Sequence, residues 1–167
     1  MIFKNKKFFF FNFLFVLTIF GLDRISKIYV IEQSKKNFNS ILFESKFLNI
    51  NLIWNEGIAF GLLSFGEKNL YNILTFVIIL VSLFILYIGI RNIGYKKYAF
   101  LGIFAGSLGN IYDRLFYNAV PDFIDFHVKD FHWFIFNIAD IFITIGVIIM
   151  IMSEFFTNNK ELHDEKF

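Results

Sequence analysis

The sequence predicts an α-helical integral membrane protein, with four transmembrane helices and a small extracytoplasmic β-sheet cradle. Hydrophobic residues make up 57% of the 167 positions, and 27 positions are phenylalanine, whereas soluble domains contain roughly 45–50% hydrophobic residues. A soluble domain of this length would leave roughly 30% of its unfolded surface in water, so its core could not cover these side chains. The apolar residues also gather in four stretches, each close to the length of a membrane span.

These four stretches define the predicted helices. They cover residues 8–31, 70–90, 98–115 and 133–156. About 20 helical residues cross a hydrocarbon core of about 30 Å, and a helix satisfies its own backbone hydrogen bonds in lipid. We therefore expect one membrane-embedded domain over residues 1–167.

The first stretch shares one property with a secretory signal peptide, because Lys4, Lys6 and Lys7 precede it. A signal peptide would continue into a cleavage site made of small residues. Residues 21–24 read Gly-Leu-Asp-Arg and do not form such a site. The stretch is therefore interpreted as a retained membrane span.

The cations beside the spans indicate the orientation. Their number is the same on both sides, but tight clusters lie at the N-terminus and in the short connection after the second span. Cations in short loops weigh most and mark the cytoplasmic side. Both termini are thus expected in the cytoplasm, and residues 32–69 and 116–132 outside it.

The first outer segment contains a pattern that is typical of a strand. Apolar residues at positions 48, 50, 52 and 54 alternate with asparagines at 49, 51 and 55, with Ile53 as the exception. Such alternation predicts a strand with one apolar and one polar face. We expect a small amphipathic sheet that rests on the membrane surface.

Charge and cysteine content exclude several classes of function. The formal net charge is +2 and the chain has no basic run, which argues against nucleic-acid binding. The chain contains no cysteine, so disulfides, a thiolate nucleophile and cysteine-based metal sites are excluded.

Acidic residues within or beside the spans are the candidate functional groups. A charged side chain at the centre of a membrane helix costs about 2.5 to 3.5 kcal/mol on insertion scales and therefore suggests a function. Asp23 has Lys27 one helical turn away, which predicts an ion pair, whereas Asp140 has no cation near it in the sequence. The acids that the expected topology gathers near the outer membrane face are Asp23, Asp113, Asp122 and Asp140.

Two of the predicted helices each carry an amide and a carboxylate on one face. Asn110 and Asp113 are three residues apart, as are Asn137 and Asp140, and residues at this spacing share a helix face. Small residues recur at helical spacing over residues 102–109 and permit close helix packing in lipid. We expect the polar ends of the third and fourth spans to lie together.

Five blocks of the sequence resemble the signature blocks of the lipoprotein signal peptidases, also called signal peptidase II. The blocks follow the order and spacing of that family and reach from the first span to the fourth. They are Asp23-Arg24-Ile25-Ser26-Lys27, Trp54-Asn55-Glu56-Gly57-Ile58-Ala59-Phe60-Gly61, Asn110-Ile111-Tyr112-Asp113-Arg114, Val120-Pro121-Asp122-Phe123 and Phe136-Asn137-Ile138-Ala139-Asp140.

The resemblance implies a role for each of these blocks. Asp122 and Asp140 match the catalytic aspartate pair of the family. Asn55 and Gly57 match the outer strand region that cradles the substrate. The remaining positions that match the family's site or its span-one block are Asp23, Lys27, Asn110, Asp113, Arg114 and Asn137.

The resemblance also implies a substrate and a location. The family removes signal peptides from diacylglyceryl-modified bacterial prolipoproteins by cleaving before the lipidated cysteine, and the cyclic peptide globomycin inhibits it. The chain is therefore expected in the bacterial inner membrane, with its active site on the extracytoplasmic face. No metal or cofactor is implied, and nothing demands more than a monomer.

The chemistry of two close carboxylates fits peptide hydrolysis independently of the resemblance. Such a pair cannot ionise twice at low cost, so one carboxyl group keeps a proton. The ionised group can take a proton from the attacking water while the protonated group stabilises the carbonyl oxygen. Asp122 is expected on a loop and Asp140 on a helix, and their sequence separation permits them to meet.

Three alternative functions remain open from the sequence. An acidic and histidine-rich cluster could bind a metal. A small transporter could use Asp113 and Asp140 as a proton path, and a membrane scaffold would need no paired acids. The residues of the possible metal cluster are Asp122, Asp125, His127, Asp130 and His132.

Overall fold

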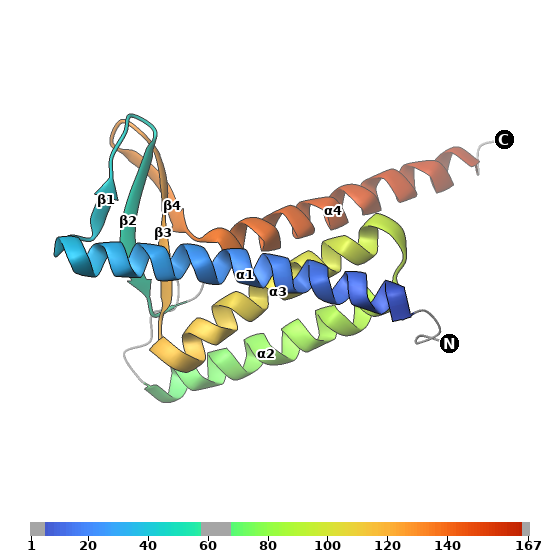
Figure 1. The fold of residues 1–167 in the computed structure, drawn as a ribbon. Helices are drawn as coiled ribbons and strands as arrows, with labels where there is room; N and C mark the ends of the chain where they lie inside the picture. Colours follow the sequence, from blue (N-terminus) through green and yellow to red (C-terminus); the bar gives the residue numbers. More distant parts are fainter. Residues whose placement is uncertain (1–5, 58–67, 165–167) are drawn as a thin grey trace.

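The computed structural model describes residues 6–57 and 68–164, as four long helices and one small sheet. Figure 1 shows the helices side by side, with the sheet at one end of the bundle and the first residues of α1 and the last of α4 at the other. The elements in chain order are α1 (Lys6–Asn37), β1 (Ile41–Phe43), β2 (Leu48–Asn55), α2 (Lys68–Arg91), α3 (Gly94–Tyr117), β3 (Val120–Val128), β4 (Phe131–Phe136) and α4 (Ile138–Asp164).

Three of these helices are long and apolar enough to cross a membrane. They are α1, α2 and α4, and few residues of their apolar windows are buried inside the protein. On α1, for example, the side chains of Phe9, Phe10 and Phe11 are each about 60% exposed. Apolar outer faces of this size fit lipid rather than water, which confirms the predicted membrane fold.

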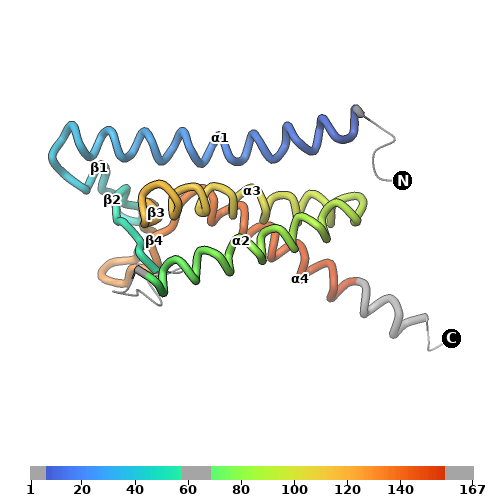
Figure 2. The backbone as a smooth tube through the Cα atoms, turned by 90° about the horizontal axis from the view of Figure 1, so that it is seen from below, coloured from blue at the N-terminus to red at the C-terminus, as the bar shows by residue number. Residues whose placement is uncertain are grey.

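The helix α3 covers the predicted third span but is less apolar, because glycines and polar residues interrupt it. It packs against α1, α2 and α4, and Figure 2 shows it in the middle of the bundle. Its buried positions include Ala105, Gly106 and Gly109. Since its neighbours shield much of its surface, α3 does not need the lipid-facing composition of the other helices.

Close packing of α3 on α4 is expected to depend on Gly106. A Cβ atom at this position would lie 2.5 Å from the carbonyl oxygen of Ala139 and 2.9 Å from Ile143. We expect Gly106→Ala to lower the free energy of unfolding by about 1–3 kcal/mol through overpacking, measured as a lower thermal midpoint in detergent.

The matched control for this prediction is Gly102→Ala, one turn earlier on the same helix. Its Cβ atom would meet only the carbonyl oxygen of Phe142, at an ordinary 3.9 Å. An equal loss of stability in both variants would contradict the proposed close contact, because Gly102 lacks this contact and alanine has a higher helix propensity than glycine.

The antiparallel sheet has the strand order β1-β2-β3-β4. The strand β2 has the bounds that the alternating pattern predicts, residues 48–55. Its pairing with β3 shifts register between Ile50 and Ile53, which is the mark of a β-bulge. The bulge places Ile53 opposite Asp122 and accounts for the break in alternation at this residue.

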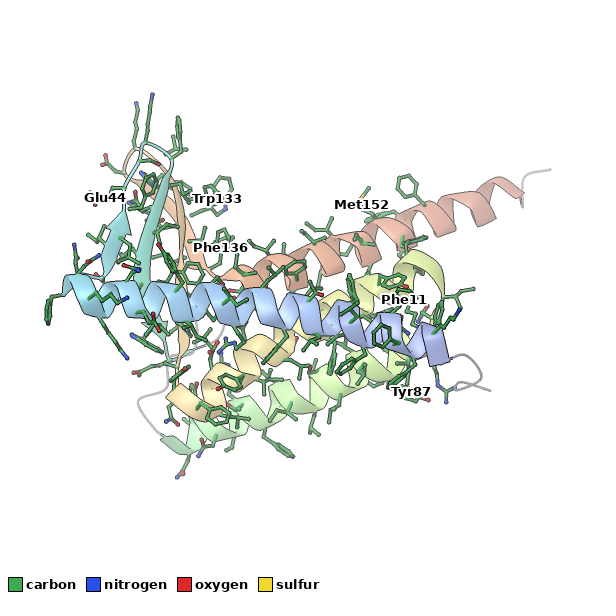
Figure 3. All side chains as sticks on the ribbon, in the orientation of Figure 1. Phe11, Glu44, Tyr87, Trp133, Phe136 and Met152 are labelled. Carbon is green, nitrogen blue, oxygen red and sulfur yellow. The ribbon has the colours of Figure 1, made fainter. Side chains whose placement is uncertain are left out.

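The second outer segment and the start of the fourth span differ from the prediction. Residues 120–128 and 131–136 form the hairpin β3–β4, so residues 133–136 are strand, and α4 begins only at Ile138. Aromatic and β-branched side chains suit a pleated surface, and pairing with β3 selects the strand. Figure 3 places Trp133 and Phe136 on this strand, and Met152 on α4.

Candidate active site

Asp140 lies in the first turn of α4, where Asn137 caps the helix. The backbone N–H of Asn137 donates to Asp140 Oδ2 at 3.1 Å, and the backbone N–H of Asp140 donates to Asn137 Oδ1 at 3.2 Å. This reciprocal arrangement is that of a capping box. It fixes the Asp140 carboxyl group at the positive end of the helix dipole, at the end of the bundle that carries the sheet (Figure 1).

Asp122 comes from the strand β3 rather than from the predicted loop. Pairing with Ile53 of β2 fixes its backbone, and only 4% of the residue is exposed. Its carboxyl group accepts hydrogen bonds from Asn55 Nδ2 at 2.9 Å and from Asn137 Nδ2 at 2.6 Å. A strand holds this group more rigidly than a loop would.

Amide groups connect the two carboxyl groups. Asn137 Nδ2 also donates to Asn110 Oδ1 at 3.2 Å, and Asn110 Nδ2 donates to Asp140 Oδ1 at 2.8 Å. Lys27 Nζ donates to the same Asn110 oxygen at 2.9 Å. Because two donors occupy that oxygen, the amide nitrogen of Asn110 must face Asp140.

A buried network of two acids and two bases supports this chain of amides. Lys27 Nζ lies 2.9 Å from Asp23 Oδ1 and 2.6 Å from Asp113 Oδ2, so the predicted pair of Asp23 and Lys27 is confirmed. Arg24 binds the same two acids at 2.7 and 2.6 Å. Asp23 Oδ1 also accepts the backbone N–H of Ala139 at 3.1 Å, which ties the network to the first turn of α4.

One feature of this network was not predicted from the sequence, because Arg24 has no predicted role although it binds Asp113 across the helix interface. Asp113, a predicted supporting residue, pairs with Arg24 and Lys27 and thus supports the packing of α1 on α3. The position of Arg24 next to Asp23 in the first signature block was the available signal.

Both candidate catalytic acids line one cavity of about 520 Å³. Asn55, Asn110 and Arg114 also line it near the acids, and most of its remaining wall is apolar, with residues such as Ile141 and Ile145 along α4. The cavity therefore has a polar end with the two carboxyl groups and an apolar extension along the helices.

Arg114 presents unused hydrogen-bond donors at this cavity. Its Nη2 donates to the carbonyl oxygen of Gly57, and its guanidinium lies 5.4 Å from the ring centroid of Tyr71. Its Nε and Nη1 atoms are buried and have no partner among the described residues. Buried donors of this kind normally have an acceptor, so a bound substrate can supply one.

Of the two predicted cradle residues, Asn55 contacts an acid directly and Gly57 contacts Asn55. Asn55 donates to Asp122, and Asn55 Oδ1 accepts the backbone N–H of Gly57 at 2.9 Å. Residues 58–61 of the same signature block lie outside the described residues.

Burial and, to a smaller extent, the negative charge of Asp140 raise the pKa of Asp122 to about 6, against the opposite effect of the hydrogen bonds from Asn55 and Asn137. The protonated form is therefore favoured up to about pH 6. A second carboxylate close by and a desolvated site are the conditions under which one acid of a pair keeps its proton.

We expect Asp140→Asn to lower the pKa of Asp122, because the variant lacks the like charge that favours protonation. The Asp122 proton would then be lost at a lower pH than in the parent protein. The measurement is the pH dependence of the infrared band of protonated carboxyl groups. The spectrum of Asp122→Asn/Asp140→Asn is subtracted from that of Asp140→Asn, so that the difference reports the Asp122 carboxyl group. An unchanged or higher midpoint would show that the two acids do not interact.

The residues of the alternative metal cluster separate into two groups. Asp122 faces the cavity with Asp140, whereas Asp125, His127 and His132 lie together further along the hairpin, and Asp130 is not part of their group. A metal at these three residues would therefore be distinct from the paired acids. The proton-path alternative also loses support, because Asp113 is held between Arg24 and Lys27.

Comparisons with known proteins agree on one family. The model of the signal peptidase II family matches residues 15–156. A lipoprotein signal peptidase of Pelagibacter ubique is 44% identical over 96% of this chain and 97% of its own length. One of Rickettsia canadensis is 38% identical over 90% of this chain and 76% of its own length.

Solved structures show the same fold. A structure described as a bacterial membrane enzyme superposes with a TM-score of 0.73, at 32% identity over 89% of this chain and 90% of that chain. A second structure with this description gives a TM-score of 0.67, at 34% identity over 85% of this chain and 90% of that chain. With the family match, the likeness in sequence and fold leads to one conclusion: the chain belongs to the signal peptidase II family, the bacterial membrane peptidases that remove signal peptides from lipoproteins.

Proposed function

We propose that this protein is an aspartic endopeptidase that cleaves diacylglyceryl-modified prolipoproteins immediately before the lipidated cysteine. The observation that carries the proposal is the placement of Asp122 and Asp140 on one cavity, with Asn137 and Asn110 as a hydrogen-bonded link between them. No covalent intermediate is needed, because paired carboxyl groups can activate water directly.

The surroundings of the two acids suggest different roles for them. Asp140 lies at the start of α4, where the helix dipole stabilises a negative charge, and we assign it the role of general base toward water. Asp122, whose pKa is raised to about 6, holds the shared proton and donates a hydrogen bond to the scissile carbonyl oxygen. As the tetrahedral intermediate collapses, a proton passes to the leaving amine.

The shape of the cavity suits a lipidated substrate. Its apolar extension along α4 can accept the apolar part of a signal peptide, while the peptide bond lies at the polar end with the acids. The donors of Arg114 that have no partner among the described residues can bind a backbone carbonyl of the substrate in the same place. Acyl chains hold such a substrate in the membrane, so the enzyme meets it within the bilayer plane.

We place the protein in the bacterial inner membrane with both termini in the cytoplasm and the sheet outside. The first residues of α1 and the last of α4 lie at the end of the bundle opposite the sheet (Figure 1), in agreement with the cation clusters of the sequence. Aromatic side chains on the hairpin, such as Phe131 and Trp133, are each 64% exposed and suit the membrane interface. One chain carries both acids, so a monomer suffices. Globomycin is expected to occupy the cavity that Asp122 and Asp140 line.

The test is cleavage of a synthetic prolipoprotein peptide by the purified protein in lipid. A diacylglyceryl-modified lipobox peptide should be cut, and mass spectrometry should place the cut directly before the modified cysteine. The control is the same peptide without the diacylglyceryl group, which should be cut much more slowly. Equal rates for both peptides, or a cut at another bond, would contradict the proposal.

A further inference from the structure

The β3–β4 hairpin carries a second group of polar side chains that the proposed hydrolysis does not use. Asp125 and His127 come from β3 and His132 comes from β4. His127 lies directly opposite His132 in the strand pairing. Each of the three residues offers one ligand atom, and these atoms all lie within 4.8 Å of one another.

The donor atoms suit a transition metal. Imidazole nitrogens and carboxylate oxygens bind Zn²⁺ at about 2.0–2.2 Å, so donors of a tetrahedral site lie about 3.4 Å apart. His132 Nδ1 already lies 2.9 Å from Asp125 Oδ2. The rings of His127 and His132 stack with their centroids 5.0 Å apart, so a small movement of His127 completes the set.

Asp125 is held in place before any metal binds. It is 3% exposed, and Asn49 Nδ2 on the neighbouring strand donates to Asp125 Oδ2 at 3.4 Å. A hydrogen bond of this kind orients a ligating carboxylate. The Asp125 carboxyl group is thus buried and held in one orientation.

His127 supplies an observation that is independent of this pair. Its Nδ1 atom is buried and has no hydrogen-bond partner among the described residues. The ring also lines an aromatic cavity of about 400 Å³ with residues such as Phe47 and Trp133. A buried ring nitrogen without a partner is costly, and a metal ion bound to this nitrogen would remove that cost.

We propose that Asp125, His127 and His132 bind one Zn²⁺ ion on the β3–β4 hairpin, separately from the catalytic pair. When the ion binds, His132 Nδ1 and a carboxylate oxygen of Asp125 bind it in place of the proton between them. That proton is released to the solvent. Three protein ligands leave a fourth position for water. The ion links β3 to β4 and stabilises the strand that carries Asp122.

The experiment is calorimetric titration of the protein with Zn²⁺ in detergent, without a polyhistidine tag. The background variant is His163→Ala, because His163 is the remaining histidine of the chain. We expect saturable binding of one ion per chain. Zinc should also raise the thermal midpoint, EDTA should reverse this, and Mg²⁺, which prefers oxygen ligands, should not replace zinc. Absence of saturable binding would overturn the proposal.

The zinc affinities of single variants test whether the ion binds at these three residues. His127→Phe keeps a stacking ring but lacks the nitrogen, and we expect at least about a tenfold loss of zinc affinity, with a smaller loss for Asn49→Leu at the orienting position. Asp130→Asn removes an acid from the same hairpin outside the cluster and should bind as the parent does. Asp122→Asn should also keep its zinc affinity, which separates this site from the catalytic one.

Two outcomes would overturn this location even if zinc binds. One is equal affinity of His127→Phe and the parent. The other is an equal loss in Asp130→Asn and His127→Phe, which would indicate general attraction of a cation to the hairpin. If His127→Phe does not fold, the zinc-dependent thermal shift of Asn49→Leu compared with Asp130→Asn decides the question.

Discussion

Replacing Asp140 by asparagine is expected to reduce kcat for cleavage of the lipidated peptide by about 10³-fold or more. Acid and base groups each contribute about 10²–10⁴-fold to proton transfer, and this variant lacks the group that takes the proton from water. Asparagine has nearly the same shape, and its side-chain oxygen can still cap the helix by accepting the N–H of Asn137. The loss should therefore appear in kcat, with the protein folded and inserted.

Asp122→Asn should show a loss of similar size, because asparagine cannot hold the proton that the Asp122 carboxyl group supplies to the pair. The two losses are not expected to add in the double variant, since residues that act as one unit are non-additive. Asp130→Asn is the control for charge near the site and should retain the activity of the parent. Substantial cleavage by Asp122→Asn or by Asp140→Asn would contradict the aspartic mechanism.

Replacing Lys27 by methionine is expected to lower the free energy of unfolding by about 3–5 kcal/mol, because the loss of one partner leaves a buried charge uncompensated. Asp23 and Asp113 are fully buried, and Lys27 is 1% exposed. The variant would leave these two carboxylates with Arg24 alone. The measurement is the thermal midpoint in detergent, together with the yield of folded protein.

The double variant Lys27→Met/Asp113→Asn tests the cause of this loss. It restores the balance of charge, with Asp23 and Arg24 as the remaining pair, and should recover more than half of the lost stability. Lys97→Met is the control, because Lys97 is also buried but contacts the ring of Phe8 and forms no ion pair among the described residues. No recovery in the double variant would show that packing, rather than charge, explains the effect.

The sequence predicted those parts of the fold that local patterns determine. The apolar stretches located the helices, and alternation at residues 48–55 located β2 at its observed bounds. The amides three residues before Asp113 and Asp140 indicated that α3 and α4 meet at a polar contact, and Asn110 does bind Asp140. Each of these patterns lies within one element of secondary structure.

Contacts between distant elements could not be predicted in this way. Arg24 binds Asp113 across 89 positions of sequence, and nothing near either residue in the chain specifies this pair. Residues 133–136 continue an apolar stretch, and only their pairing with β3 makes them a strand. Pairing with β2 fixes Asp122 on a strand, and pairing with β4 brings His127 opposite His132.

The central position of α3 has a consequence for biogenesis. A helix with this many polar residues gains little from lipid when it leaves the translocon alone, whereas α4, which follows after one short hairpin, forms the largest of the interfaces of α3. We therefore expect the two helices to enter the bilayer as a pair late in synthesis. A nascent chain that stops after α3 would remain accessible to chaperones and proteases until the final helix emerges.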